Sequence, residues 1–328
     1  MNIFRLAAVL PLLLCAGLWA ASSHPGVRIA TPWPAQNTVV AMLGYGDSIV
    51  GTSMIAKAIP LFRQSVPGIA QVPAISASGG ELNAEQVIAL GANLLFVADS
   101  GTELPRQALL AQAGVKVVSF RANAMAALVQ RVQQTADVLG PDARQKAQRY
   151  RRYFERNVAL VARGLKGLPA SGRIRLYHSM GNPLMTSGRP SLNQDWMDLA
   201  GAANVAEHWF DSRPGRSGDV AAEQVIAANP QVIVAMNKRD ADSILASPQW
   251  ASVDAVRHHR VYVNPKGMFW WCRETSEEAL QFLWLAKTLY PERFKDVDMR
   301  AETRGFYRQF FNLSLSDRQL DDILNPPQ

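Results

Sequence analysis

A six-residue sequence occurs twice in this chain, and each copy stands before a strand-like run. Residues 84–89 and residues 222–227 both read AEQVIA. The apolar run 94–98 (LLFVA) follows the first copy, and the run 232–236 (VIVAM) follows the second. A repeated helix-then-strand unit indicates two similar α/β lobes. Two such lobes leave a cleft at the carboxyl ends of their strands, where ligands usually bind.

Short β-branched runs alternate with helical stretches along the whole chain, which predicts mainly parallel sheets. The expected strands are residues 27–30, 48–50, 94–98, 115–120, 173–178, 232–236 and 260–263. The expected helices are residues 36–43, 125–139, 141–165, 276–290, 299–311 and 316–324. We also expect a capping box from Thr275 to Glu278 at the start of the helix 276–290.

The helix expected at 141–165 has one apolar face and connects the two halves of the chain. The apolar positions, at three- and four-residue steps, are Ala143, Ala147, Tyr150, Phe154, Val158, Val161 and Leu165. The arginines that fall mostly elsewhere around the helix are Arg144, Arg149, Arg151, Arg152, Arg156 and Arg163. We interpret these arginines as a solvated face rather than a nucleic-acid surface.

No linker rich in Gly, Ser or Pro separates the halves. The expected division is an N-terminal lobe at 23–140, a connecting helix at 141–167, and a C-terminal lobe with terminal helices at 168–328. The content of 48% hydrophobic and 19% charged residues excludes a disordered chain. The net charge of +7 is spread along the sequence, so it favours anionic ligands without indicating nucleic acid.

Residues 1–22 are expected to be a cleavable export signal. Arg5 gives a positive start, residues 6–19 are almost wholly apolar, and small residues follow. The run is short for a membrane span, and Pro11 interrupts it. The alternatives are an uncleaved anchor and a lipoprotein signal at Cys15, for which Leu14 is a poor match. We expect the signal to direct the chain to the periplasm, which is an oxidising compartment. Cleavage leaves Cys272 as the single cysteine, so no intrachain disulfide can form there.

Further short segments follow one another in a recognisable order. They are RIATP at 28–32, DSIVG at 47–51, NAEQ at 83–86, TSG at 186–188, AGAANV at 200–205, AEQ at 222–224, NPQVI at 229–233 and WLAKTLYPE at 284–292. With these segments, nearly all of the mature chain resembles the iron-siderophore and cobalamin family of periplasmic substrate-binding proteins, which feed ABC importers. The resemblance implies two Rossmann-like α/β lobes joined by one long interdomain helix, a cleft between them, and modest hinge motion.

The resemblance also implies a docking surface for the membrane permease. Family members present one acidic residue on each lobe to arginines of a permease dimer. The matching positions are Glu85 and Glu223, in the two copies of the repeat. Identical surroundings in both lobes suit a partner with twofold symmetry. The alternative is that both are ordinary solvated glutamates.

Ligand contacts in this family come from the loops that follow the strands. In the first lobe these are Trp33, residues 76–81 and residues 99–101. In the second lobe they are Tyr177, His178, Arg189, the 209–216 loop with Arg213 and Arg216, the 237–239 segment with Arg239, and the 268–273 segment with Trp270, Trp271 and Arg273.

Aromatic rings offer rigid contact area to flat chelates, and arginines offer planar forks to carboxylate or catecholate oxygens. The 268–273 segment is the best candidate, because it precedes a helix amino terminus that favours anions. The alternatives are core packing for one of its two tryptophans and simple surface charge for Arg213 and Arg216.

No set of carboxylates and histidines has the spacing of a bare metal site, so neither a metal site nor a resident cofactor is expected. The histidines are scattered, and the neighbours His258 and His259 would point apart before a strand. Cys272 lies in the candidate pocket segment, where it either packs as a semi-buried thiol or touches the ligand.

Two segments are similar to hydrolase motifs. Residues 177–181 (YHSMG) resemble a nucleophile elbow, but Tyr177 replaces the first glycine and Pro183 follows where a helix should start. Residues 46–48 (GDS) resemble the start of secreted SGNH esterases, but Asp254 is followed at the required spacing by Arg257 rather than histidine. A secreted SGNH or α/β-type hydrolase therefore stays a distant alternative.

These observations predict a monomeric, non-enzymatic periplasmic binding protein. Its expected partners are an ABC permease dimer in the inner membrane and a small-molecule metal chelate, with no nucleic acid. The expected ligand is a ferric siderophore, so the transported solute would contain iron; haem, a corrinoid and a nickel chelate are the alternatives. An exported sensor domain is an alternative of a different class.

Overall fold

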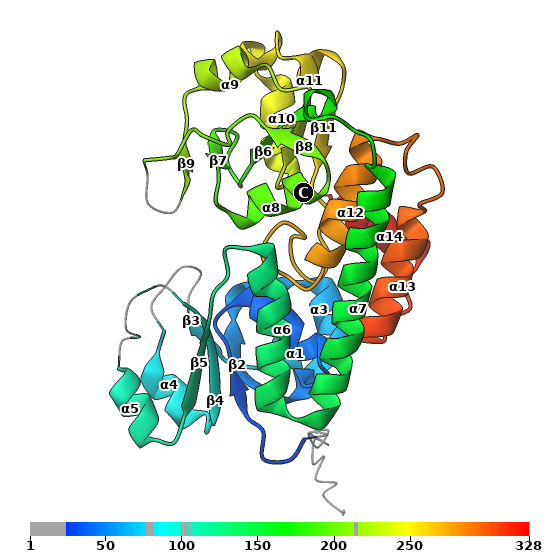
Figure 1. Cartoon of the computed structure of the whole chain (residues 1–328). Coiled ribbons are helices and arrows are strands. Elements are labelled where there is room, and N and C mark those ends of the chain that lie inside the picture. Colours follow the sequence, from blue (N-terminus) through cyan, green and yellow to red (C-terminus); the bar gives the residue numbers. More distant parts are fainter. Residues whose placement is uncertain are drawn as a thin grey trace, which may run out of the picture.

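The computed structural model describes residues 24–76, 82–99, 101, 104, 106–212 and 216–327. It shows two α/β lobes, one above the other in Figure 1, with a helical strut along one side of both. The expected α/β class with two lobes is confirmed. The export signal expected at 1–22 lies outside the described residues. Within them, no helix is both long and apolar enough to cross a membrane.

The N-terminal lobe has a five-stranded parallel sheet in the order β3-β2-β1-β4-β5. Its strands are β1 (Ile29–Ala30), β2 (Ile49–Ser53), β3 (Ala74–Ser76), β4 (Leu94–Ala98) and β5 (Lys116–Phe120). Its helices are α1 (Pro34–Met42), α2 (Met54–Ala58), α3 (Pro60–Ser65), α4 (Ala84–Ala89), α5 (Gln107–Gln112) and α6 (Met125–Leu139). In β4, Phe96 joins the main core while Leu95 and Val97 join a second apolar cluster. Both faces of the sheet are covered, which explains the continuous apolar sequence of this strand.

The C-terminal lobe has a four-stranded parallel sheet in the order β11-β10-β6-β8 and a small antiparallel pair, β7-β9. Its strands are β6 (Ile174–Ser179), β7 (Met185–Ser187), β8 (Ala202–Asn204), β9 (Ser217–Asp219), β10 (Val232–Ala235) and β11 (Val261–Val263). Its helices are α8 (Leu192–Leu199), α9 (Ala222–Ala228), α10 (Lys238–Ala246) and α11 (Asp254–Arg257). Alternate residues of β6 and β10 again enter two different apolar clusters.

The repeated AEQVIA sequence forms equivalent elements in the two lobes. The first copy is α4, which leads into β4, and the second begins α9, which leads into β10. Both strands are inner strands of parallel sheets. The first alanine and the valine of each copy are buried, whereas its glutamate is exposed. The repeat therefore marks the same helix-then-strand unit twice, as the sequence predicts.

Helix α7 (Pro141–Gly164) is the strut. Its 24 residues correspond to roughly 36 Å at 1.5 Å per residue. It packs against α6, α8 and α12 (Glu278–Leu289), and so reaches both lobes. The expected apolar face is confirmed, with Val158 and Leu165 only partly buried. All six arginines expected on the opposite face are exposed.

The terminal helices α13 (Met299–Phe311) and α14 (Asp317–Leu324) complete the strut. An aromatic cluster joins α13 to α7. The ring centroids of Tyr150 and Phe310 are 5.8 Å apart, and those of Tyr153 and Phe306 are 5.5 Å apart. On the next turn, Phe154 meets Phe282 of α12 at 5.4 Å. Such ring pairs each add about 1 kcal/mol beyond the burial of their area.

The structure differs from the sequence-based expectation in two ways. The capping box from Thr275 to Glu278 is wrong: α12 begins at Glu278, and the Thr275 hydroxyl instead donates to Glu277 Oε2 at 3.0 Å. Several short elements were not predicted, namely α2, α3, α5, α8, α10, α11, β3 and β7 to β9. Most span fewer than nine residues, which is too short to show a clear apolar period.

Two helical glycines give a matched test of how the strut is packed. A Cβ on Gly164 would lie 2.5 Å from Cζ of the buried Phe294, whereas a Cβ on Gly305 in α13 would meet nothing within 4 Å. Alanine is better than glycine in a helix by about 1 kcal/mol. We expect Gly305→Ala to raise the free energy of unfolding by roughly 0.5–1 kcal/mol and Gly164→Ala to lower it by about 1–3 kcal/mol.

Urea unfolding followed by circular dichroism measures both changes. Stabilisation by both substitutions would contradict the close packing of α7 on Phe294.

Candidate functional site

The interlobe segment, residues 264–277, runs from β11 to α12 and passes between the two lobes (Figure 1). Its end bonds to the N-terminal lobe and to the strut. The Thr275 and Thr38 hydroxyl oxygens are 3.1 Å apart, and the Tyr150 hydroxyl donates to Ser276 O at 2.8 Å. This segment contains the predicted contacts at 268–273, so the fold brings that stretch to the boundary between the lobes.

The buried carboxylate of Glu277 holds the interlobe segment in shape. It accepts hydrogen bonds from the backbone N–H groups of Met268 at 2.7 Å and Phe269 at 3.0 Å. The hydroxyls of Thr275 and Tyr307 also donate to it. Burial raises the pKa of this carboxyl to about 7, against the opposing effect of the four donors. These hydrogen bonds fix the turn that carries Phe269 and Trp270.

A second direct contact between the lobes lies at the amino end of α6. The Met125 N–H donates to Asp195 Oδ2 at 3.0 Å, and the Leu192 N–H donates to Asn123 Oδ1 at 3.1 Å. Both bonds join the segment around α6 to α8 in the C-terminal lobe. Burial raises the pKa of the Asp195 carboxyl, partly offset by the bond from Met125. The lobes are thus tied by hydrogen bonds at α8 as well as through the strut.

Arg131 is a buried cation next to this boundary. It comes from α6, is 1% exposed, and stacks its guanidinium 4.1 Å from the centre of the Trp33 ring. One of its N–H groups donates to the Glu274 backbone oxygen, while Nε and Nη1 have no partner among the described residues. Burial lowers its pKa to about 10, and the nearby Glu274 and Glu278 oppose that shift.

Glu278 is the buried carboxylate that faces this cation. It is completely buried in the first turn of α12, and neither of its oxygens has a hydrogen-bond partner in the described structure. Burial raises its pKa well above the usual value, and Glu274 adds to this, whereas Arg131 and Arg273 oppose it. Buried polar atoms without partners are costly, and the raised pKa of Glu278 favours its uncharged form, which lowers that cost.

His178 at the end of β6 is also buried and without a partner. It is 1% exposed, neither ring nitrogen has a hydrogen bond within the described residues, and its ring packs edge-on against Trp196 with centroids 5.1 Å apart. Burial, and then the positive charge of Arg273, lower its pKa to about 3. His178 is therefore neutral at physiological pH, and Arg273 lies within electrostatic reach of it.

Arg273 of the interlobe segment and Arg239 of α10 are exposed cations of the C-terminal lobe. Neither forms an ion pair in the part of the chain that the structure describes. Arg273 follows the aromatic stretch of the interlobe segment, and Arg239, in the first turn of α10, donates to Gly181 O at 3.2 Å. Trp33 and Trp270 are both half-buried, and Trp270 lies 4.3 Å from Lys266 Nζ. Each ring thus has a cation over one face, Arg131 at Trp33 and Lys266 at Trp270.

Other predicted contacts are buried in the core or bonded to neighbouring residues. Tyr177 and Trp271 are fully buried in the core, and the Tyr177 hydroxyl donates to Pro183 O at 2.9 Å. Arg189 forms ion pairs with Asp198 at 2.6 Å and Glu207 at 2.7 Å. Arg216 donates to the Phe210 backbone oxygen at 3.1 Å. Arg213, residues 77–81 and Ser100 lie outside the described residues.

The structure shows charged residues that the sequence reasoning missed. Arg131 and Glu278 are buried, although both are residue types expected at the surface. For Arg131 a signal exists: it stands three residues after Leu128 and one before Val132, on the apolar stripe of α6. The position of Arg131 on this stripe therefore indicates a buried charge.

Nothing in the described ranges gathers three His, Cys, Asp or Glu side chains as a metal site. Cys272 is completely buried, and burial raises the pKa of its thiol to about 12. Its reactive thiolate form is therefore suppressed at neutral pH.

Glu85 and Glu223 occupy the same place in α4 and α9, in the first turn of each helix. Both are exposed. Glu85 pairs with Arg106, whereas Glu223 has no ion pair within the described structure. In Figure 1, α4 lies in the lower lobe and α9 in the upper one.

Comparison with known proteins places this architecture in a family. The sequence profile of the periplasmic binding protein family matches residues 29–267, and the chain belongs to that family. It is therefore a substrate-binding protein of an ABC transporter and not an enzyme.

Individual relatives share about a quarter of their residues with this chain. The molybdate-binding protein MolA of Haemophilus influenzae is 26% identical over 314 residues, which cover 89% of this chain and 85% of the relative. Its structure with bound molybdate superposes with a TM-score of 0.76 at 23% identity, over 88% of this chain and 94% of that one. A periplasmic solute-binding protein of Veillonella parvula gives a TM-score of 0.78 at 23% identity, over 91% of each chain.

Helicobacter pylori CeuE with bound Ni(II) gives a TM-score of 0.72 at 20% identity, over 90% of this chain and 94% of that one. These likenesses confirm the two-lobed fold.

The buried Glu277 predicts a specific pH dependence of stability. Its pKa is raised from 4.5 to about 7 in the folded protein. Between these values the folded state keeps a proton that the unfolded state has lost, so this carboxyl destabilises the fold increasingly as pH rises through the window. Glu277→Gln removes that dependence. We expect the unfolding free energy of the variant, minus that of the natural protein, to rise by roughly 3 kcal/mol from pH 4.5 to pH 7.

Urea unfolding at closely spaced pH values measures the difference. Glu292→Gln is the control, because Glu292 is exposed and makes none of these contacts. A flat difference curve for Glu277→Gln would show that the carboxyl does not carry the proton.

Proposed function

We propose that this protein captures an anionic metal-containing solute between its lobes and delivers it to an ABC permease. The observation that supports this most is Arg273, an exposed cation at the interlobe segment without an ion pair among the described residues. An arginine of this kind presents a planar fork to oxygen atoms of an anion. Arg239, Trp33 and Trp270 supply further charge and ring surface beside it.

Among such solutes, a ferric siderophore is the first candidate. The half-buried rings of Trp33 and Trp270 suit the flat groups of a chelate, and arginines suit its carboxylate or catecholate oxygens. Molybdate is the second candidate, favoured by the similarity to MolA over most of both chains. Both solutes are anions that contain a metal, so both use the same arginines.

Native mass spectrometry of protein purified from its own periplasm distinguishes these ligands. A retained ferric chelate identifies the first candidate, and a retained molybdate identifies the second. If haem, a corrinoid or a nickel chelate is retained, both candidates are wrong, but the transported solute is still a metal complex. A bound sugar, peptide or amino acid would overturn the proposal.

Arg273→Gln tests the role of the cation. Each charge-assisted hydrogen bond contributes about 1.5–3 kcal/mol, so we expect the Kd for the retained ligand to rise at least about tenfold. The control is Arg318→Gln, which removes the same charge from an exposed position of α14. Tryptophan fluorescence titration measures both affinities. Equal affinities for the two variants would remove Arg273 from the site.

Permease docking through Glu85 and Glu223 is the second part of the proposal. Both are exposed, acidic and equivalent in the two lobes, as a twofold partner requires. Reversal of both charges in Glu85→Lys/Glu223→Lys is expected to abolish uptake of the ligand by whole cells and to leave its Kd unchanged.

The control for this double variant is Glu292→Lys, an exposed charge reversal beyond α12. Uptake at the normal rate by the double variant would show that the permease docks elsewhere.

A further inference from the structure

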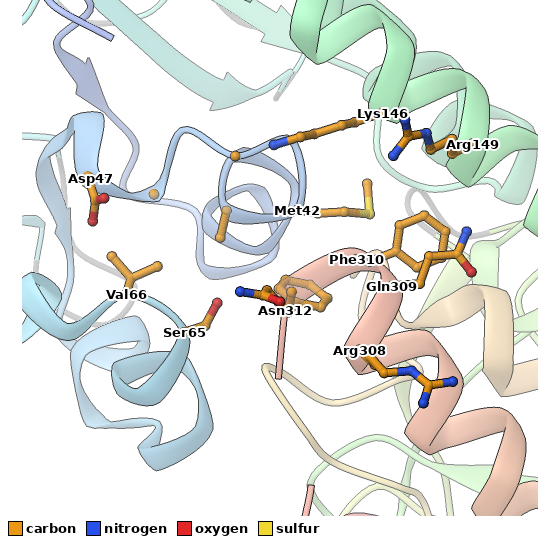
Figure 2. A pocket seen from close by; sticks show the side chains of 14 residues that line it. Met42, Asp47, Ser65, Val66, Lys146, Arg149, Arg308, Gln309, Phe310 and Asn312 are labelled. Carbon is orange, nitrogen blue, oxygen red and sulfur yellow. The ribbon is translucent and has the colours of Figure 1, made fainter. Parts of the chain in front are cut away.

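A hollow lies away from the interlobe segment. It has a volume of about 460 Å³ and is formed where the end of α1, the end of α3, α7 and the end of α13 meet (Figure 2). Its charged lining residues are Lys146, Arg149 and Arg308, with Asp47 as the single carboxylate. None of these residues belongs to the interlobe segment or to its neighbours, so this hollow is distinct from the proposed ligand site.

Lys146 is the central cation of this pocket. It is half-buried, and Figure 2 shows its side chain reaching from α7 across the end of α1. Its ammonium lies against Gly44, where a Cβ would collide with Nζ. Lys146 has no carboxylate within ion-pair distance in the described structure. Burial, together with the neighbouring Arg149, lowers its pKa, while Asp142 one turn earlier opposes this.

The arginines of the pocket are also unpaired, in contrast to their neighbours. Arg149 and Arg308 are exposed and form no ion pair with any described residue. Nearby, Arg156 is paired with Glu302 at 2.5 Å, and Arg304 is paired with Asp317 at 2.8 Å. The carboxylates along α13 and α14 therefore neutralise other arginines and leave these two. Three cations line this hollow, and Asp47 is the single carboxylate in its lining.

The remaining lining defines the kind of anion that fits. Ser65, Gln309 and Asn312 offer hydrogen bonds, while Met42, Val66 and Phe310 offer apolar surface. Gly46 lets the chain pack closely on Val66 in the wall, since a Cβ there would lie 2.6 Å from Val66 Cγ2. Cations suit a phosphate group, whose oxygens accept several bonds at once. The volume and the apolar wall suit an organic group attached to it.

We propose that this pocket is a second binding site, for the phosphate group of an organic phosphate, held by Lys146, Arg149 and Arg308. The same chemistry is offered by a soluble phosphate ester and by an anionic phospholipid headgroup. The site is separate from the cargo site, so cargo binding is not required for it.

The test compares two probes and two double variants. The probes are glycerol 3-phosphate, followed by calorimetry, and phosphatidylglycerol vesicles against pure phosphatidylcholine vesicles, followed by co-sedimentation. Lys146→Gln/Arg308→Gln removes two charges from the pocket. Arg144→Gln/Arg163→Gln removes two charges from exposed positions of α7 outside it. Urea unfolding verifies that each variant is folded. If the pocket double variant does not fold, the single variant Arg308→Gln replaces it.

We expect the natural protein to bind glycerol 3-phosphate or the anionic vesicles. The pocket variant should bind at least about tenfold more weakly, and the control variant within about twofold of the natural protein. Binding of glycerol 3-phosphate assigns a soluble ester, and binding of the anionic vesicles alone assigns a lipid headgroup. The proposal is overturned if neither probe binds, or if both double variants lose binding equally, since the latter shows only the effect of net charge.

Discussion

The apolar face of α7 is the contact on which the architecture depends. Tyr150, Tyr153 and Phe154 bury their rings against α12 and α13, and the same helix packs on α6 of one lobe and α8 of the other. A single 24-residue helix that is fixed along its length holds the lobes at a set distance. The modest hinge motion that the family resemblance implies stays a prediction.

The second constraint is the interlobe segment, which depends on Glu277. Four donors converge on this buried carboxylate and shape the turn that carries Phe269, Trp270 and Arg273. Around it lie Arg131 and Glu278, whose polar atoms lack a full set of partners in the described structure. Buried polar groups of this kind cost stability. The burial of Arg131 and Glu278 beside the interlobe segment is therefore a cost that the rest of the packing must offset.

Long, strongly patterned elements could be predicted from the sequence, and short ones could not. The bounds of β4, α6 and α13 agree with the expected ranges, because each has a clear apolar pattern and a distinct end. The repeat predicted the two lobes, since it marks equivalent helices before equivalent strands.

The candidate site was predicted less completely. The segment 268–273 lies between the lobes, but Tyr177 and Trp271 are core residues, and the side chains of Arg131 and Glu278 are buried. Sequence patterns assign charged residues to the surface, so a buried ion beside a binding site escapes them. The long-range bonds of the interlobe segment, such as that between Tyr150 and Ser276, have no local signal at all.

A crystal structure of the protein loaded with its natural ligand, with anomalous data collected at the absorption edge of the metal, tests the central claim most directly. The account predicts one anomalous peak between the lobes, within contact of the interlobe segment, with Arg273 bonded to oxygens of the solute and α7 unchanged. A peak elsewhere on the molecule, or lobes that reorganise α7 to enclose the solute, would contradict it.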